Sequence, residues 1–172
     1  MSSPSAHVRS FDHVAIAVPD LAPAIDLFHR LMGGVFIAGG DDDGKGIRTI
    51  QFRFPPGVKI EIMQPVRPDS YLHGFLERHG PGMHHVTLFV DDLAAAVTRL
   101  EGRGYEVVNT SFARPRWKET YLRPRSGFGT LIQLAETNRD WTVPIDPTLT
   151  IDDVLAGRIA WIADEPVRRA EV

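Results

Sequence analysis

The chain has 172 residues, of which 43% are hydrophobic and 24% are charged, which is enough for one globular domain with a full core. A formal net charge of −3 excludes the basic surface on which general nucleic-acid and membrane binders depend, so we expect neither partner. The absence of cysteine excludes disulfides, thiolate metal sites and cysteine nucleophiles. No stretch resembles a signal peptide or a membrane span, and we expect a cytoplasmic protein.

The chain begins with a Ser-rich segment, and we expect residues 1–10 to be a disordered or extended N-terminus. A strand is predicted over Phe11–Val18, because its small and branched apolar side chains alternate between two faces. Asp20 is placed to cap a helix with an apolar stripe of roughly helical spacing, and Gly33 and Gly34 end that helix.

The next segment, Gly39–Gly46, contains three aspartates and four glycines and predicts a flexible turn. Its aspartates lack the ligand spacing and the closing acidic residue of an EF-hand, which argues against calcium. Two strands are predicted over residues 47–54 and 58–63, joined by the turn Pro55-Pro56-Gly57. We interpret residues 11–66 as a βαβββ module.

A second module is predicted over residues 83–136, after a Pro- and Gly-rich connection in which residues 71–79 form a helical turn or two. Its expected elements are a strand at 83–90, a helix from Asp91 or Asp92 to Leu100, and strands at 105–109, 119–122 and 130–135. Residues 137–172 are expected to form a C-terminal extension with a short helix capped by Thr150. The apolar face of that helix would include Ile159 and Ile162.

A repeat relates the two modules, because residues 11–21 recur as residues 83–93 at a spacing of 72. The same spacing continues without a gap to the last strand of each module. Four polar side chains therefore fall at equivalent strand positions, in the pairs His13 with His85 and Glu61 with Gln133. Such self-similarity predicts one pseudo-symmetric domain, residues 11–136.

These segments resemble the vicinal oxygen chelate superfamily, which includes glyoxalase I, methylmalonyl-CoA epimerases, extradiol dioxygenases and bleomycin-resistance proteins. The segments Gly82–Val86 and Tyr121–Leu134 most resemble the epimerases. The resemblance implies an α+β fold in which two tandem βαβββ modules form a half-barrel centred on a metal.

The resemblance also implies a ligand set for one divalent ion, which could be Co, Ni, Zn, Mn or Fe: His13, Glu61, His85 and Gln133. Two imidazoles, a carboxylate and an amide oxygen suit an octahedral ion of borderline hardness, with room for substrate or water. The alternative is that both histidines are hydrogen-bonded core residues without a ligand role.

The order of these ligands departs from the epimerase pattern, in which the amide comes from the first module and the carboxylate from the second. Here Glu61 comes first and Gln133 second. The additional glutamate that epimerases carry in module one is also missing, whereas Glu119 stands on the corresponding strand of module two. We therefore expect Glu61 and Glu119 to be an acid–base pair for proton transfer next to a carbonyl. The alternative for Glu119 is a surface side chain beside Lys118.

A further group of residues is expected to bind substrate: Arg114, Arg116, Lys118 and Tyr121. The three cations would clamp a carboxylate or phosphate, unless they belong to a solvated loop. The leading function is a metal-dependent isomerase, epimerase or lyase acting on a small thioester or carboxylate, in a homodimer. An Fe(II)-dependent extradiol-type dioxygenase, using His13, His85 and Glu61 as a triad, is one alternative, and a bleomycin-resistance-like binding protein is another.

Overall fold

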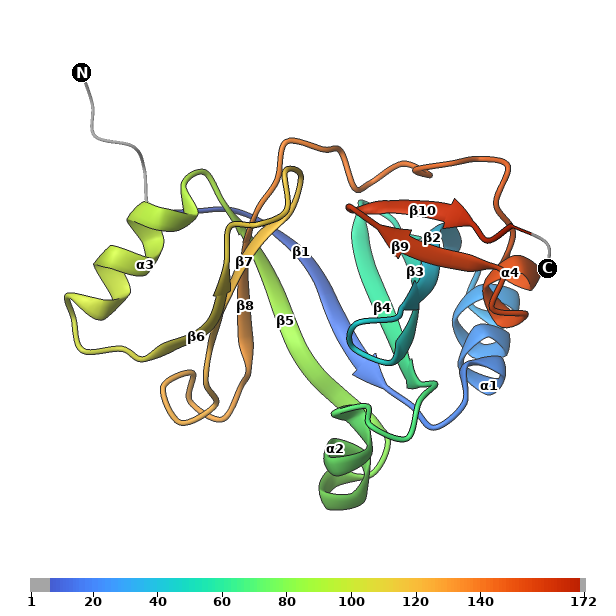
Figure 1. Ribbon diagram of the computed structural model, residues 1–172, viewed down its shortest axis with the longest axis horizontal. Coiled ribbons are helices and arrows are strands. Elements are labelled where there is room, and N and C mark those ends of the chain that lie inside the picture. The colour runs from blue at the N-terminus through green and yellow to red at the C-terminus, as the bar shows by residue number, and fades with distance from the viewer. Residues whose placement is uncertain (1–6, 171–172) are drawn as a thin grey trace. The chain divides into compact units, whose positions relative to one another are not determined.

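The first repeated segment forms strand β1 (Val8–Ala17) in a computed structural model that describes residues 7–170 (Figure 1). Asp20, three residues after the strand, has an extended backbone and accepts a hydrogen bond from the Ala22 amide at 3.0 Å, which caps helix α1 (Leu21–Ile25). The chain continues as the π-helix η1 (Asp26–Leu31). The expected cap, helix and glycine end are therefore present, and the part of residues 1–10 before His7 lies outside the described residues.

Three antiparallel strands follow: β2 (Val35–Asp42), β3 (Ile47–Phe54) and β4 (Val58–Pro65). Strand β2 crosses most of the segment expected to be a flexible turn, so that prediction is wrong up to Asp42. The physical reason is close packing, since a Cβ on Gly39 would meet the Thr49 carbonyl at 2.7 Å and Val154 at 2.9 Å. The glycines allow other elements to approach the strand.

The described chain divides into two compact units. Unit 1 contains residues 7–14 and 85–139, and unit 2 contains residues 15–84 and 140–170. Strands β1 and β5 (Gly82–Val90) contribute residues to both units. The module limits expected from the repeat stay a prediction, because spatial contact divides the chain at other positions.

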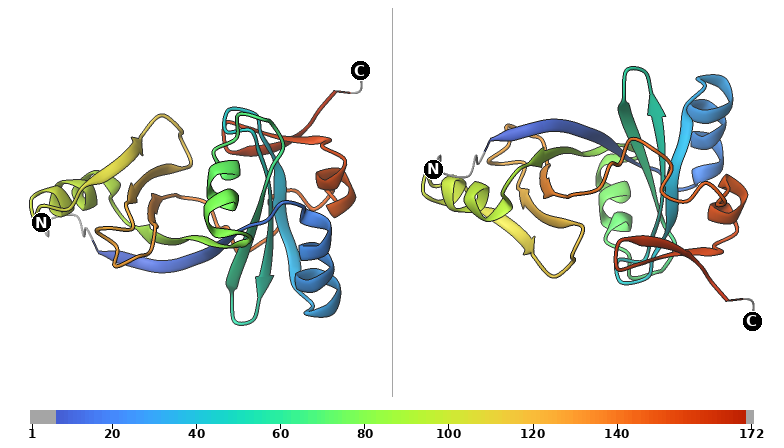
Figure 2. Two further views of the ribbon diagram at one scale, coloured as in Figure 1. Left: turned by 90° about the horizontal axis from the view of Figure 1, so that it is seen from below. Right: turned by 90° about the horizontal axis from the view of Figure 1, so that it is seen from above.

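In unit 2 the strands follow the order β10-β9-β2-β3-β4-β1, with β9 (Ile159–Ile162) and β10 (Glu165–Arg168) contributed by the C-terminal extension. Helices α1 and α4 (Ile151–Leu155) cover one face of this sheet, as Figure 2 shows. Their shared core contains Leu21, Ile25, Phe52, Ile62, Val154 and Ile159. The connection expected to be helical forms α2 (Leu72–His79).

Thr150 caps helix α4 as expected, in a capping box with Asp153. The helix is shorter than the apolar pattern suggested, because Gly157 adopts a φ of +68° shortly after its end. Ile159 and Ile162 therefore lie in β9 and not on a helix face. Ile159 is fully buried, whereas Ile162 is 58% exposed.

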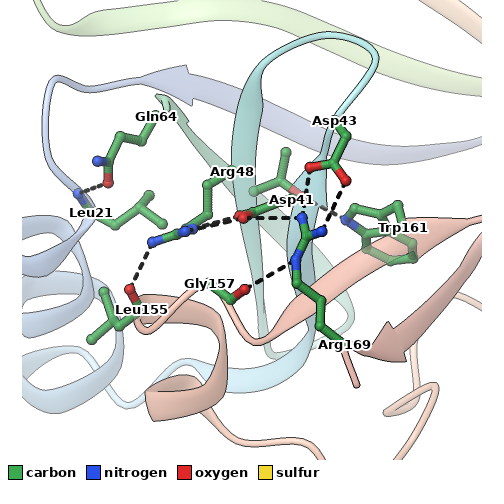
Figure 3. Close-up of polar contacts among 10 residues, drawn as sticks. Leu21, Asp41, Asp43, Arg48, Gln64, Leu155, Gly157, Trp161 and Arg169 are labelled. Atoms are coloured by element: carbon green, nitrogen blue, oxygen red, sulfur yellow. Dashed lines mark hydrogen bonds and ion pairs between the residues drawn. The ribbon is translucent and has the colours of Figure 1, made fainter. Parts of the chain in front are cut away.

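Arginine side chains attach this extension to strand β2 and its turn (Figure 3). Arg48 donates to Asp41 at 2.6 Å and to the Leu155 carbonyl at 2.7 Å. Arg169 donates to both carboxylate oxygens of Asp43, at 2.6 and 3.0 Å, and to the Gly157 carbonyl. Two aspartates of the Gly39–Gly46 segment thus serve as acceptors for arginine.

In unit 1 the strands follow the order β1-β5-β8-β7-β6, where β6 is Val107–Ser111, β7 is Lys118–Leu122 and β8 is Ile132–Glu136. Helix α3 (Leu93–Glu101) is capped by Asp92, whose side chain accepts from the Ala95 amide at 2.9 Å. Its apolar side packs on the sheet through a core of Val90, Leu93, Ala96 and Leu134. Among residues 7–170, no helix has the length and apolar character needed to cross a membrane.

Candidate active site

Strand register places three polar side chains of unit 1 on one sheet face. Gln133 on β8 faces Thr87 on the parallel neighbour β5 and Tyr121 on the antiparallel neighbour β7. His85 precedes Thr87 by two residues and Glu119 precedes Tyr121 by two, so strand alternation adds both to this face. The intervening side chains point to the opposite face, toward α3.

The Thr87 hydroxyl joins the expected ligands of this unit. It donates to Gln133 Oε1 at 2.6 Å and lies 3.0 Å from His13 Nε2. The ring centroids of His13 and His85 are 5.5 Å apart. His13, His85 and Gln133 are at most 4% exposed, so the expected ligands of unit 1 form a buried cluster.

A carboxylate behind His13 orients the imidazole. Asp12 Oδ2 lies 2.7 Å from His13 Nδ1, and both side chains are buried. In the neutral imidazole this contact holds the proton on Nδ1 and directs the Nε2 lone pair toward Thr87. Metal-binding histidines typically have such a carboxylate partner.

The same contacts test whether a cation fits the cluster. Gln133 Oε1 accepts the single proton of the Thr87 hydroxyl, and His13 Nε2 lies 3.0 Å from the same hydroxyl oxygen. The cluster thus holds an imidazole nitrogen and an amide oxygen around one hydroxyl. A divalent ion would accept a lone pair from each of these two atoms, and imidazole nitrogen with amide oxygen is a suitable donor combination.

Glu119 is fixed at the edge of this cluster by three donors to its Oε2 atom. Gln133 Nε2 donates at 2.6 Å, Trp117 Nε1 at 2.8 Å and the Tyr121 hydroxyl at 3.3 Å. Gln133 thus turns its oxygen toward Thr87 and its nitrogen toward Glu119. The carboxylate is part of the polar face and not an isolated surface group.

Glu61 belongs to unit 2, on β4, where it faces Gln51 on β3 and accepts a hydrogen bond from it at 3.0 Å. Lys59, two residues earlier, is 1% exposed and approaches Gln51 Oε1 at 3.4 Å. Its ammonium also lies 5.8 Å from the ring centre of Trp141. Burial lowers the pKa of His84 in this unit, and the Glu61 carboxylate opposes that shift.

The residues expected to bind an anion have different environments. Lys118 forms an ion pair with Glu136 at 2.5 Å, and Glu136 also accepts from the Leu93 amide. Arg114 is half-buried and Arg116 is exposed, both in the segment between β6 and β7. Their role in substrate binding stays a prediction.

Sequence reasoning missed several polar neighbours of the expected site residues: Asp12, Thr87, Trp117, Gln51 and Lys59. Asp12 stands directly before His13, and Thr87 stands two residues after His85. Both spacings carried a usable signal, since an adjacent acid and a same-face hydroxyl are common neighbours of a histidine ligand. Gln51 and Lys59 become recognisable only once the β3–β4 register is known.

The family pattern described as the glyoxalase/bleomycin resistance protein/dioxygenase superfamily matches residues 12–121. The chain belongs to this superfamily. It is 33% identical, over 75% of its length and 98% of the relative, to an ethylmalonyl-CoA/methylmalonyl-CoA epimerase of Cereibacter sphaeroides. It is 30% identical to the mitochondrial methylmalonyl-CoA epimerase of Homo sapiens, over 73% of the chain and 72% of the relative.

A solved structure supports the same relationship. The methylmalonyl-CoA epimerase from Mycobacterium tuberculosis is 30% identical and superposes with a TM-score of 0.69, covering 81% of this chain and 94% of that one. The expected resemblance and the α+β fold of the superfamily are therefore confirmed. So is the prediction that the chain is an enzyme of this superfamily, related to epimerases.

Proposed function

We propose that this enzyme is a divalent-metal-dependent epimerase that moves a proton at the carbon next to the carbonyl of an acyl-CoA thioester. One observation carries the proposal: a single buried face of unit 1 presents two imidazoles, an amide oxygen and the Glu119 carboxylate. The epimerase names of the relatives support methylmalonyl-CoA or ethylmalonyl-CoA as substrate.

In this proposal the metal ligands are His13, His85, Gln133 and Glu61. Glu61 joins the set because it occupies the position of Gln133 in the repeat and supplies the only anionic ligand. When bound, the metal supplies positive charge that stabilises the negative charge developing on the substrate carbonyl during proton removal.

The protein's own residues then move the proton. Glu61 and Glu119 act as the acid–base pair, one removing the α-proton and the other returning a proton. Gln133 and Tyr121 hold Glu119 in place through its Oε2 atom. We propose that Arg114 and Arg116 meet anionic groups of the substrate, whereas Lys118 is already paired with Glu136.

The decisive experiment follows α-deuterium incorporation. The metal-loaded protein is incubated in D₂O with methylmalonyl-CoA or ethylmalonyl-CoA, and the substrates are analysed by mass spectrometry. We expect one deuterium at the α-carbon. Absence of exchange, together with oxygen uptake on a catechol in the presence of Fe(II), would contradict the proposal and assign the chain to the dioxygenases.

A separate measurement tests the ligand set. Glu61→Ala removes an anionic ligand and Gln133→Ala removes a neutral one, so the first variant should retain less metal after gel filtration. Elemental analysis gives the occupancy of both variants. Equal occupancy in Glu61→Ala and the wild type would exclude Glu61 as a ligand, whatever the outcome of the exchange experiment.

A further inference from the structure

Unit 1 contains a cavity on the sheet face opposite to the polar cluster. This cavity of about 490 Å³ lies between α3 and the sheet. This volume is within the range of about 300–1,000 Å³ that is common for small-molecule pockets. Its apolar walls are formed by Leu88, Val90, Leu100, Leu122, Ile132 and Leu134.

The polar lining of the cavity is mainly basic. Arg99 and Arg103, both exposed, contribute to it with His7 and Tyr105. Arg99 Nη1 lies 2.8 Å from His7 Nε2. Within residues 7–170, the Arg103 side chain has no ion pair, and the cavity lining includes no aspartate or glutamate. The feature thus combines apolar walls with two guanidinium groups.

We propose that this cavity binds a small amphipathic anion, a single-chain carboxylate. The apolar chain lies along the leucine and isoleucine side chains of β5 and β8, where it removes apolar surface from water. The carboxylate pairs with Arg99 and Arg103, because the planar guanidinium group matches the two oxygens of a carboxylate.

Charge favours this occupant over a second copy of the chain. A two-fold contact over the cavity would place the same surface of both copies against itself and so gather four arginines at one interface. That arrangement is unfavourable without an anion. A carboxylate instead complements the basic edge, and its chain complements the walls.

The test uses the full-length protein and isothermal titration with decanoate, with decanol as its uncharged analogue. The wild type should bind decanoate. In the double variant Arg99→Gln, Arg103→Gln, decanoate affinity should fall by about 10- to 100-fold, since charged hydrogen bonds are lost. Decanol affinity should be the same in both proteins, because the apolar walls are unchanged. Arg30→Gln, on the exposed side of η1 in unit 2, is the matched control and should alter neither value.

Two results would overturn the proposal. One is a wild type that does not bind decanoate, or a double variant that binds it with unchanged affinity. The other is a wild type that is a dimer by light scattering and that the cavity-wall substitution Leu88→Asp converts to a monomer, while decanoate binds neither protein, which would assign the cavity to a second copy. These measurements do not involve the proposed metal site, so they are independent of the proposed function.

Discussion

Units 1 and 2 use the same arrangement of strands and a helix, but they differ on both sheet faces. On the polar face, Gln133 faces Tyr121 in unit 1, and Glu61 faces Gln51 in unit 2. On the other face, α4 and β9 complete the core of unit 2, whereas unit 1 has a cavity beside α3. The repeat therefore preserves positions and allows their chemistry to diverge.

The strand register shows which positions differ between the two units. Glu119 precedes Tyr121 by two residues and faces Ala135, while Thr49 precedes Gln51 by two and faces Met63. Unit 1 thus has a carboxylate where unit 2 has a hydroxyl. The other member of the proposed acid–base pair, Glu61, belongs to unit 2.

The largest expected effect comes from Glu119→Gln, which removes a carboxylate from unit 1 and preserves its shape. Because a general acid or base typically contributes about 10²–10⁴-fold in rate, the epimerisation rate should fall on that scale. Metal content should be retained, since Glu119 is not a proposed ligand. Glu136→Gln is the matched control because Glu136 pairs with Lys118. A Glu119→Gln enzyme with wild-type turnover would reject the two-base site.

The sheet faces that pack against helices predict that the two units respond differently to the loss of an apolar side chain. Ile159→Ala in unit 2 empties a fully buried position in the core shared with α4, and should lower the free energy of unfolding by about 2–5 kcal/mol. Ile132→Ala in unit 1 should cost less, because Ile132 is half-buried and lines the cavity. Urea titrations of both variants measure the free energy of unfolding. Equal losses would show that the helix-covered sheet faces of the two units are packed alike.

A smaller effect is expected for Asp12→Asn, which removes the carboxylate charge beside Nδ1 of the proposed ligand His13. At the repeat spacing of 72 residues, the counterpart of Asp12 is His84, so this carboxylate is specific to His13. Loss of such a partner typically costs 10–100-fold in metal affinity. Competition with a chelator measures the affinity, with His84→Asn as the comparison. Unchanged affinity in Asp12→Asn would mean that the imidazole needs no carboxylate to hold it.

The sequence predicted the repeated element order, the caps Asp20 and Thr150, and three buried polar residues that converge in unit 1. These depend on local signals, namely alternation, capping residues and a fixed repeat spacing. Strand β9 could not be predicted in this way, because Ile159 fits an apolar helix pattern until Gly157 is known to end the helix. The roles of Gly39 and Lys59 depend on contacts with distant segments, which a single sequence does not reveal. The homodimer stays a prediction.

The smallest effect concerns the C-terminal extension, which has no counterpart in unit 1. Hydrogen bonds from Arg168, and then from Thr150, hold the pKa of Asp153 well below its ordinary value of 3.8. A lowered pKa in the folded state means that the charged carboxylate stabilises the fold above pH 3.8. This stabilisation is lost progressively as the pH falls below that value, because the unfolded state then binds a proton more readily than the folded state.

Asp153→Asn should therefore be less stable than the wild type at neutral pH, and the difference should shrink as the pH falls below about 4. Urea titrations at pH 7, 5, 4 and 3 measure the free energy of unfolding of both proteins. Asp152→Asn, at the neighbouring exposed residue of α4, is the control and should show a difference of only a few tenths of a kcal/mol. A gap between Asp153→Asn and the wild type that is constant from pH 7 to pH 3 would show that the arginine contacts do not act through the charge of Asp153. The attachment of the extension to unit 2 would then depend on its apolar core and on the remaining ion pairs of Arg48 and Arg169.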